Sequence, residues 1–299
     1  MSAAAPPLTE VEGLVKRFPL TRGVLFRRRV GEVAAVDDVT LAVHAGESLG
    51  IVGETGSGKS TLARILLNLL EPTRGVVRWR GEDVTRARGA RLLELRRARQ
   101  MVFQDPAGSL NPRKTVGAAV ADPFAIHGLL PDRAARGRRV GELLEQVGLE
   151  PALANRYPHE LSGGMRQRVG IARAIALGPE LLVADEPVSA LDVSIQAQIL
   201  TLLRDLRRDL GLTLVLIAHD LAVVRHMCDR VAVMRHGRLV EVAPVEELYA
   251  TPREDYTREL LAAVPRIPGP PPAAAPAPDA AAPASPAGDA AQSSSSSST

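Results

Sequence analysis

The stretch SLGIVGETGSGKSTLARILLNLL, residues 48 to 70, decides the fold of this chain. It consists of a short apolar run, a glycine-rich loop and a leucine-rich segment with helical spacing, which predicts a buried strand, a tight loop and a helix. The loop GETGSGKST, Gly53 to Thr61, matches the pattern G-x-x-x-x-G-K-[ST] of phosphate-binding loops. Its glycines let backbone N–H groups turn toward phosphate oxygens, and the following helix adds its positive N-terminal end. The sequence therefore predicts a nucleotide site.

Two side chains of this loop have specific predicted roles. Lys59 should reach the β- and γ-phosphates, and Ser60 should ligate Mg²⁺. The other residues expected to contact the nucleotide are Gly53, Glu54, Thr55, Gly56, Ser57, Gly58 and Thr61.

Two more apolar runs have the composition of strands that are buried on both faces of a parallel sheet. They are LLVA, Leu181 to Ala184, and LTLVLIA, Leu212 to Ala218. The alternation of such strands with helical patterns indicates the α/β class.

Other segments differ from this pattern. The stretches at residues 32–47 and 75–84 are typical of antiparallel strands flanking the core, and residues 106–158 show helical patterns without a convincing strand. We therefore expect an α/β core with an antiparallel β subdomain and an inserted helical subdomain at about 106–160.

Polar residues follow both apolar runs. Asp185 ends the first run and should lie beside Mg²⁺. Glu186 comes next, where its carboxylate could orient and polarise water for attack on a γ-phosphate, and Pro187 should hold Glu186 in extended geometry. His219 follows the second run, at the sheet edge where ligands bind in open α/β folds, which favours a contact with the γ-phosphate.

The stretch LSGGMRQRV, Leu161 to Val169, predicts a second anion-attracting site. Ser162 is a good N-cap residue, and Gly163 and Gly164 expose the first N–H groups of the predicted helix. This helix start cannot reach phosphates enclosed by its own loop unless the fold brings the two together. The economical alternative is a dimer, in which it covers a nucleotide held by a second subunit.

The order of these motifs resembles that of the ATP-binding-cassette (ABC) ATPases, over roughly residues 8 to 240. After the glycine loop come MVFQDP with Gln104, then LSGG, LLVADEP, SALD and His219. The resemblance implies ATP as cofactor with Mg²⁺, and a head-to-tail dimer of identical or different subunits with two ATP molecules at its interface.

Residue roles also follow from this resemblance. It implies that Gln104 senses Mg²⁺ and the γ-phosphate, so that the catalytic residues are Glu186, His219 and Gln104 and the metal-site residues are Ser60, Gln104 and Asp185. It implies that Phe18 stacks on adenine and that Asp192 helps to pair the subunits. The implied contacts across the dimer are Leu161, Ser162, Gly163, Gly164 and Met165, together with Ser189, Ala190, Leu191 and Asp192. Met165 stands where many cassettes carry Gln.

Flanking segments look like the ATPase subunits of oligopeptide and dipeptide ABC importers, in particular the second of the two such subunits. These segments are VKRFPLTRG, MVFQDPAGSLNPR, YPHELSGG and DEPVSALDVSIQAQ. The resemblance implies two integral membrane permease subunits as partners, an extracytoplasmic solute-binding protein acting indirectly, and a place on the cytoplasmic face of the membrane.

The C-terminal part divides in two. Residues 242–265 resemble the C-terminal extension of the same importer subunits, so the ATPase domain is expected to span residues 1–265. Residues 266–299 are rich in Pro, Ala and Ser, which predicts a disordered tail. This tail replaces a cysteine-rich stretch that is often found there, so an iron–sulfur site is not supported.

Composition narrows the function classes. The net charge of +3 and the 3% of aromatic residues argue against nucleic acid as a partner. The single cysteine, Cys228, excludes an internal disulfide and a zinc site of several thiolates, and a buried thiol is expected. No apolar run approaches the roughly 18 residues needed to span a bilayer, and the first residues lack the pattern of a signal peptide.

Alternatives within the ABC class stay open. A motor for another solute such as nickel, or for peptide export, would share every catalytic residue. A soluble ABC ATPase acting on DNA would need a long coiled coil between the loop and LSGG, where this chain has about a hundred residues. Ribosome-acting relatives carry two cassettes, and this chain has one. The basic stretches at residues 26–30 and 85–100 are interpreted as solvated surface, with lipid headgroups as the alternative.

Overall fold

The computed structural model describes residues 6–22, 28–189 and 191–263. Ala190, the basic stretch at residues 26–30 in part, and the whole of the predicted tail at 266–299 lie outside the described residues.

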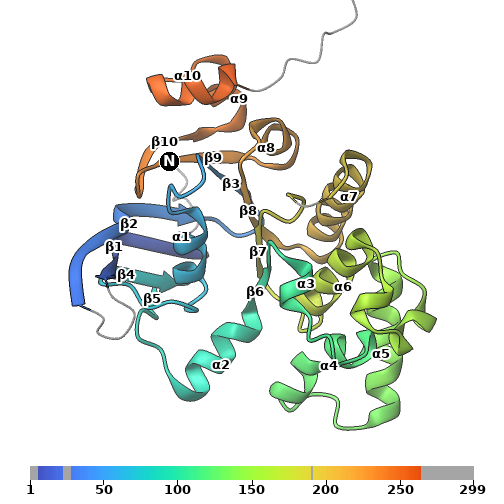
Figure 1. The fold of residues 1–299 in the computed structure, drawn as a ribbon. Coiled ribbons are helices and arrows are strands. Elements are labelled where there is room, and N and C mark those ends of the chain that lie inside the picture. The colour runs from blue at the N-terminus through green and yellow to red at the C-terminus, as the bar shows by residue number, and fades with distance from the viewer. Residues whose placement is uncertain (1–5, 23–27, 190, 264–299) are drawn as a thin grey trace, which may run out of the picture. The chain divides into compact units, whose positions relative to one another are not determined.

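A six-stranded sheet forms the centre of the described chain (Figure 1). The strand order is β10-β9-β3-β8-β7-β6, and all neighbours are parallel except β10, which pairs antiparallel with β9. The strands are β3 (Ser48–Val52), β6 (Arg99–Val102), β7 (Leu181–Asp185), β8 (Thr213–Ala218), β9 (Arg230–Arg235) and β10 (Arg238–Pro244). The three apolar runs identified in the sequence are thus β3, β7 and β8.

The sheet separates two apolar cores, which explains why these strands are apolar at every position. In β7, Leu182 and Ala184 belong to one core, whereas Leu181 and Val183 belong to the other. Because successive side chains of a strand point to opposite faces, a strand covered on both sides needs apolar residues throughout.

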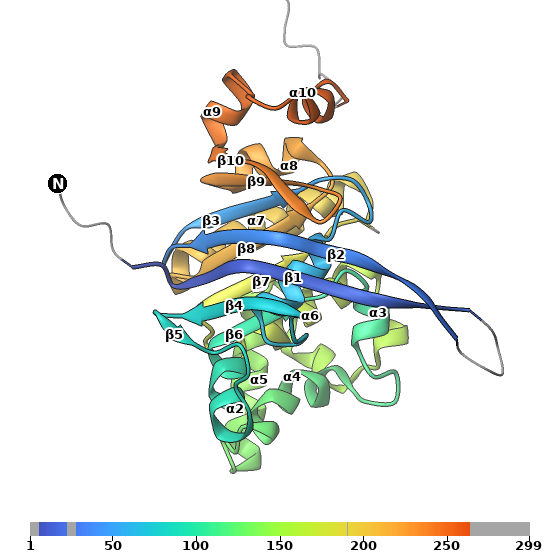
Figure 2. The same ribbon diagram turned by 90° about the vertical axis from the view of Figure 1, so that its left-hand side faces the viewer.

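A second sheet is antiparallel, as expected, and Figure 2 shows it facing the viewer. Its order is β2-β1-β4-β5, and its strands are β1 (Thr9–Arg22), β2 (Arg28–Val43), β4 (Arg74–Trp79) and β5 (Glu82–Asp83). Helix α1 (Lys59–Leu66) packs against β1, β2 and β7, and so joins the two sheets. Helix α2 (Gly89–Ala98) leads into β6.

Helix α1 is shorter than the leucine spacing indicates. The pattern continues to Leu70, but the helix ends at Leu66, and Asn68 has a positive φ of 51°. The Asn68 side-chain amide donates to the carbonyl of Val84 at 2.7 Å. Asparagine tolerates left-handed backbone, and this bond to the strand region favours the turn over another helical step.

Helices fill the segment between β6 and β7. They are α3 (Pro106–Ser109), α4 (Val116–Ile126), α5 (Arg133–Gln146), two 3₁₀ segments (Pro151–Asn155 and Pro158–Glu160) and α6 (Gly163–Ile175). Local caps start two of them: the Thr115 hydroxyl accepts from the N–H of Ala118, and the Asp132 carboxylate accepts from the N–H of Ala135. Figure 1 shows α3, α4, α5 and α6 grouped together beside α7 (Val193–Leu210).

The chain then runs through α8 (Leu221–Met227) to the β9–β10 hairpin and ends in α9 (Val245–Ala250) and α10 (Asp255–Ala262). Cys228, directly after α8, is buried as expected, and burial raises the pKa of its thiol to about 12. Among the described residues, the helices are too short or too polar to cross a bilayer.

Candidate nucleotide site

The glycine loop between β3 and α1 lies close against neighbouring backbone. Gly53 and Gly58 have φ angles of 147° and 104°, which favour glycine. A Cβ atom on Gly53 would lie 2.1 Å from the carbonyl oxygen of Met234, and one on Gly58 would lie 2.1 Å from that of Ala35. The loop therefore has a shape that only glycine permits at these two positions.

Lys59 is nearly enclosed by this loop. Its side chain donates from Nζ to the carbonyl oxygens of Gly53 at 2.6 Å and Glu54 at 2.8 Å, and the residue is 4% exposed. Burial lowers the pKa of Lys59, while the carboxylates of Glu186, Asp185 and Glu54 act against that shift. A buried ammonium group among carbonyl oxygens fits a phosphate ligand, which would supply the opposite charge.

Ser60 and Asp185 are hydrogen-bonded to each other beside the loop. The Ser60 hydroxyl donates to Oδ1 of Asp185 at 2.9 Å, and Asp185 is 2% exposed at the end of β7. Burial raises the pKa of Asp185, and the bond from Ser60 opposes that shift. In the described part of the chain, no three His, Cys, Asp or Glu side chains are close enough to hold a metal. One carboxylate and one hydroxyl instead fit Mg²⁺ that is shared with nucleotide phosphates.

The expectation of extended geometry at Glu186 is wrong. Its φ is +43°, in the left-handed region. The N–H of Glu186 donates to the carbonyl of Ile217 on β8, and its own carbonyl accepts from both the N–H and the hydroxyl of Ser189. These bonds hold a tight turn directly after β7 and override the local preference that Pro187 imposes.

Three predicted catalytic residues meet at this turn. The Gln104 side chain donates from Nε2 to Oε2 of Glu186 at 2.8 Å, and Nδ1 of His219 lies 4.0 Å from the same oxygen. The Glu186 side chain is 15% exposed and that of His219 is 59% exposed. The three residues come after β6, β7 and β8, at the carboxyl edge of the parallel sheet.

The LSGG segment starts α6, as predicted. Ser162 is the N-cap residue, and its hydroxyl accepts from the N–H of Met165 at 3.3 Å. A Cβ atom on Gly164 would lie 2.6 Å from Cγ2 of Ile195 in α7, and one on Gly163 would lie 3.3 Å from Cδ2 of Leu191. The two glycines therefore also permit close packing against the start of α7, a role that the sequence pattern does not predict.

The structure keeps this segment and the glycine loop in different parts of the described chain. Helix α6 packs against α3, α4, α5, α7 and the edge strand β6, whereas α1 packs against β1, β2 and β7. Asp192 is the N-cap residue of α7. Phe18 lies on β1, 39% exposed, with Nζ of Lys16 at 5.3 Å from its ring centre.

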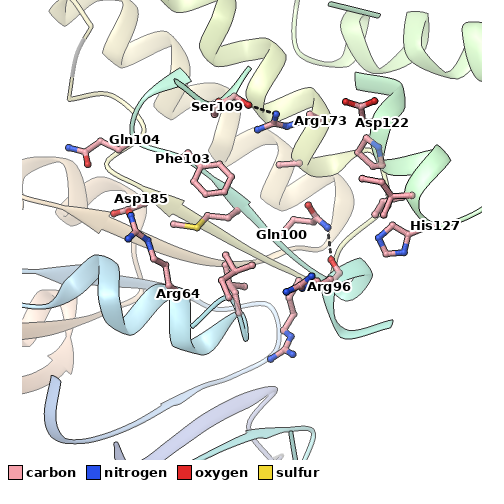
Figure 3. A pocket seen from close by; sticks show the side chains of 18 of the residues that line it. Arg64, Arg96, Gln100, Phe103, Gln104, Ser109, Asp122, His127, Arg173 and Asp185 are labelled. Atoms are coloured by element: carbon pink, nitrogen blue, oxygen red, sulfur yellow. Dashed lines mark hydrogen bonds between the residues drawn. The ribbon is translucent and has the colours of Figure 1, made fainter. Parts of the chain in front are cut away.

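A cavity of about 760 Å³ opens beside Gln104 and Asp185 (Figure 3). It extends from these two residues to Asp122 on α4 and to His127, which follows that helix. Four of its apolar side chains are 39–66% exposed, namely Leu69, Leu93, Phe103 and Ile126. Its cationic lining residues are Arg64, Arg96, Arg99 and Arg173.

Two tyrosines near the site were not found from the sequence. The hydroxyl of Tyr256 in α10 accepts from the N–H of Glu54 in the glycine loop at 3.1 Å. The hydroxyl of Tyr249 in α9 donates to the carbonyl of Leu221, two residues after His219. Only the resemblance of residues 242–265 to an extension pointed to this region, and it gave no contact.

Comparison with known proteins places the chain in a family. Residues 36–189 match the family model described as ABC transporter. The chain is 50% identical over 259 residues to the oligopeptide transport ATP-binding protein AppF of Bacillus subtilis, which covers 86% of this chain and 78% of that protein. It is also 50% identical over 259 residues to the glutathione import ATP-binding protein GsiA of Salmonella typhimurium, covering 87% of this chain and 41% of that protein.

A solved structure agrees with the fold. The dimeric post-hydrolysis structure of the ATP-binding cassette MJ0796 with ADP and Pi has a TM-score of 0.71 and 30% identity, and the match covers 79% of this chain and 98% of that one. The expected fold class, an ABC-type α/β core with an antiparallel β subdomain and inserted helices, is thereby confirmed. The motifs, the geometry of the loop and these similarities together show that this chain belongs to the ABC transporter family.

Proposed function

We propose that this chain is the ATP-hydrolysing subunit of an importer for oligopeptides or related small peptides. The 50% identity to a protein named for oligopeptide transport supports this solute class, and glutathione, itself a small peptide, is compatible with it. The solute-binding partner, not this chain, would select among them.

ATP would supply the γ-phosphate that is transferred to water. The Mg²⁺ bound with it would neutralise the negative charge that develops on the phosphates. Lys59 would hold the β- and γ-phosphates, since its ammonium group is already enclosed by the loop. Ser60 and Asp185 would bind Mg²⁺, and the alignment of hydroxyl and carboxylate at 2.9 Å supports this.

Glu186 would orient the attacking water and accept its proton. The side-chain amide of Gln104 donates to Oε2 of Glu186 and so fixes the direction of the carboxylate. His219 lies 4.0 Å from this oxygen, on the same edge of the sheet, where it would contact the γ-phosphate.

The working form would be a head-to-tail dimer with an identical or a homologous subunit. In one chain, α6 packs with α3, α4, α5, α7 and β6, whereas α1, which follows the glycine loop, packs with β1, β2 and β7. A second subunit is therefore the natural source of the N–H groups at residues 161–165 that would cover the ATP. The solved cassette dimer gives a precedent for such pairing.

The proposed coupling of hydrolysis to transport rests on the position of Gln104. Gln104 both lines the 760 Å³ cavity and donates a hydrogen bond to Glu186. Whatever fills the cavity can thus move the residue that directs the carboxylate. The exposed apolar side chains and the arginines of the lining fit a short cytoplasmic helix of a membrane permease, with an apolar face and an acidic residue. This partner would hold the chain at the cytoplasmic face of the membrane.

A co-purification experiment tests the proposal. Tagged Glu186→Gln protein, produced in cells that make its natural partners and extracted from membranes with ATP present, should retain two polytopic membrane proteins and a second cassette subunit. Ile126→Asp, added to the same protein, should release the membrane proteins, because it places a charge on the side chain of the cavity that is 66% exposed.

Recovery of nucleic acid or ribosomes, or of the cassette alone in both variants, would overturn the transport assignment. ATP binding by the purified Ile126→Asp protein is the folding control. The solute-binding protein encoded with the recovered permeases would then identify the solute by direct binding of short peptides.

A further inference from the structure

Helix α9 packs against the β9–β10 hairpin and α8, and α10 follows it (Figure 1). They are packed and not merely attached: Leu248 is fully buried, and Val245 and Tyr256 are 8% and 4% exposed within the same core as β7 and β8. We call residues 245–262 the C-terminal brace.

The brace touches the glycine loop through Tyr256. The Tyr256 hydroxyl accepts from the N–H of Glu54, and Nζ of Lys59 donates to the carbonyl of Gly53. That N–H and that carbonyl belong to one planar peptide group. Tyr256 and Lys59 therefore fix the Gly53–Glu54 peptide from its two ends.

The surroundings hold the tyrosine and the loop together. The guanidinium of Arg235, the last residue of β9, lies 4.4 Å from the centre of the Tyr256 ring. In the turn that follows, the N–H of Gly237 donates to the carbonyl of Ser57 at 2.9 Å. The hairpin and the brace thus contact the same loop at two places.

The brace also reaches the segment that carries His219. The Tyr249 hydroxyl donates to the carbonyl of Leu221, the first residue of α8, and the guanidinium of Arg225 lies 5.1 Å from the Tyr249 ring centre. Burial raises the pKa of Tyr249, so its hydroxyl keeps the proton that it donates.

Glu241 ties the brace to the sheet. Its carboxylate, on β10, accepts from the backbone N–H groups of Arg253 at 3.0 Å and Glu254 at 3.2 Å, just before α10. Glu241 is 8% exposed, which makes this connection between β10 and the start of α10 an enclosed one.

We propose that the C-terminal brace sets the geometry of both loops that act on ATP. Tyr256 positions the glycine loop, and Tyr249 positions the segment with His219; neither is a catalytic residue. The inference rests on the proposed ATP hydrolysis by this chain. It assigns to α9 and α10 a positioning role in ATP binding and turnover.

Substitution of the two tyrosines by phenylalanine should have different kinetic effects. Tyr256→Phe frees one end of the Gly53–Glu54 peptide, so the loop of the free protein samples other conformations and ATP must order it. We expect ATP affinity to fall about five-fold, as it does when the binding-competent state is less populated. Tyr249→Phe loosens the His219 segment and should lower kcat about five-fold with KM changed less than about two-fold.

Thr251→Val is the matched control. The Thr251 hydroxyl donates to the carbonyl of Glu247 inside the brace, so the variant also removes a hydroxyl from this region. It should keep the parental ATP affinity and kcat. Glu241→Ala, which releases the brace from β10, should combine the two tyrosine effects.

The measurements are ATP titration and steady-state hydrolysis with the full chain, with amide hydrogen exchange of the peptide that contains Glu54. In Tyr256→Phe this exchange should speed up in the absence of nucleotide, while Tyr249→Phe and Thr251→Val leave it unchanged. The inference would be overturned if kcat and KM changed equally in both tyrosine variants. It would also be overturned if Tyr256→Phe kept the parental ATP affinity and the parental rate of amide hydrogen exchange.

A failure of the proposed function would give a different result from a failure of this inference. A parental chain that binds no ATP would remove the ATPase assignment itself. The exchange comparison needs no ATP, so it would still show whether Tyr256 holds the Glu54 N–H.

Discussion

The Ser60 hydroxyl donates a hydrogen bond of 2.9 Å to Oδ1 of Asp185, a residue 125 positions away. This contact joins the first turn of α1 to the end of β7, so two distant motifs form one oxygen pair. The pair has an energetic cost, because Asp185 is almost fully buried and its pKa is raised by that burial. A buried carboxylate without a bound cation opposes folding.

Asp185→Asn should therefore separate stability from metal binding. The amide keeps the shape and removes the charge, so we expect Tm to stay or rise, while Mg²⁺ no longer adds to the Tm increase that ATP produces. Thermal melts with ATP, with and without Mg²⁺, measure both effects. An unchanged Mg²⁺ contribution in the variant would remove Asp185 from the metal site.

The stability of the parental protein relative to Asp185→Asn should depend on pH with a defined sign. A carboxylate whose folded pKa is raised binds its proton more tightly in the folded state, so stability falls as pH rises from its ordinary pKa of 3.8 through the folded pKa. Parental protein should lose stability relative to Asp185→Asn across that window and keep a constant difference above it. Melts of both proteins over this pH range provide the comparison.

Lys59→Met should abolish ATP binding without destabilising the chain. Burial lowers the pKa of Lys59, so at neutral pH the ammonium group opposes folding, and this cost disappears as pH rises through the lowered pKa toward 10.5. Methionine fills similar space without charge. We expect no ATP-dependent shift of Tm and a Tm at or above the parental value; a large loss of Tm would indicate that the bonds to Gly53 and Glu54 outweigh desolvation.

Glu186→Gln should bind ATP with parental affinity and hydrolyse it at least about a hundred-fold more slowly. The amide cannot accept the proton of water, and general-base catalysis is worth about 10²–10⁴-fold. Single-turnover hydrolysis and ATP titration of the purified protein give the two values. Gln104→Ala is the companion variant: it keeps the carboxylate but removes the 2.8 Å bond that directs it, so its loss of rate should be smaller. Parental turnover by Glu186→Gln would remove Glu186 from the base role.

The sequence allowed accurate prediction where a feature depends on local pattern. The strand before the loop was located from its apolar residues, and Asp185 was located at a strand end because a buried run stops there. The left-handed backbone of Glu186 is not predicted by the sequence, since it depends on a bond to Ile217 from a neighbouring strand. The contact of Tyr256 with Glu54 joins residues 202 positions apart, and a single tyrosine in an amphipathic helix carries no signal for such a contact.

Two glycines of α6 provide a matched test of packing at the LSGG segment. A Cβ atom on Gly164 would meet Cγ2 of Ile195 at 2.6 Å, whereas one on Gly170 would meet nothing within 4 Å. Both lie in the same helix, where alanine is preferred over glycine by about 0.5–1 kcal/mol in the interior; this gain applies in full to Gly170 and less to Gly164, which lies in the first turn.

Gly170→Ala should therefore raise the free energy of unfolding by about that amount. Gly164→Ala should lower it, by about 1–3 kcal/mol before the helical gain, because α7 must move away from the start of α6. Urea unfolding of the three proteins measures the difference. A stabilised Gly164→Ala would mean that Ile195 changes rotamer at little cost, and that packing against α7 does not require glycine at this position.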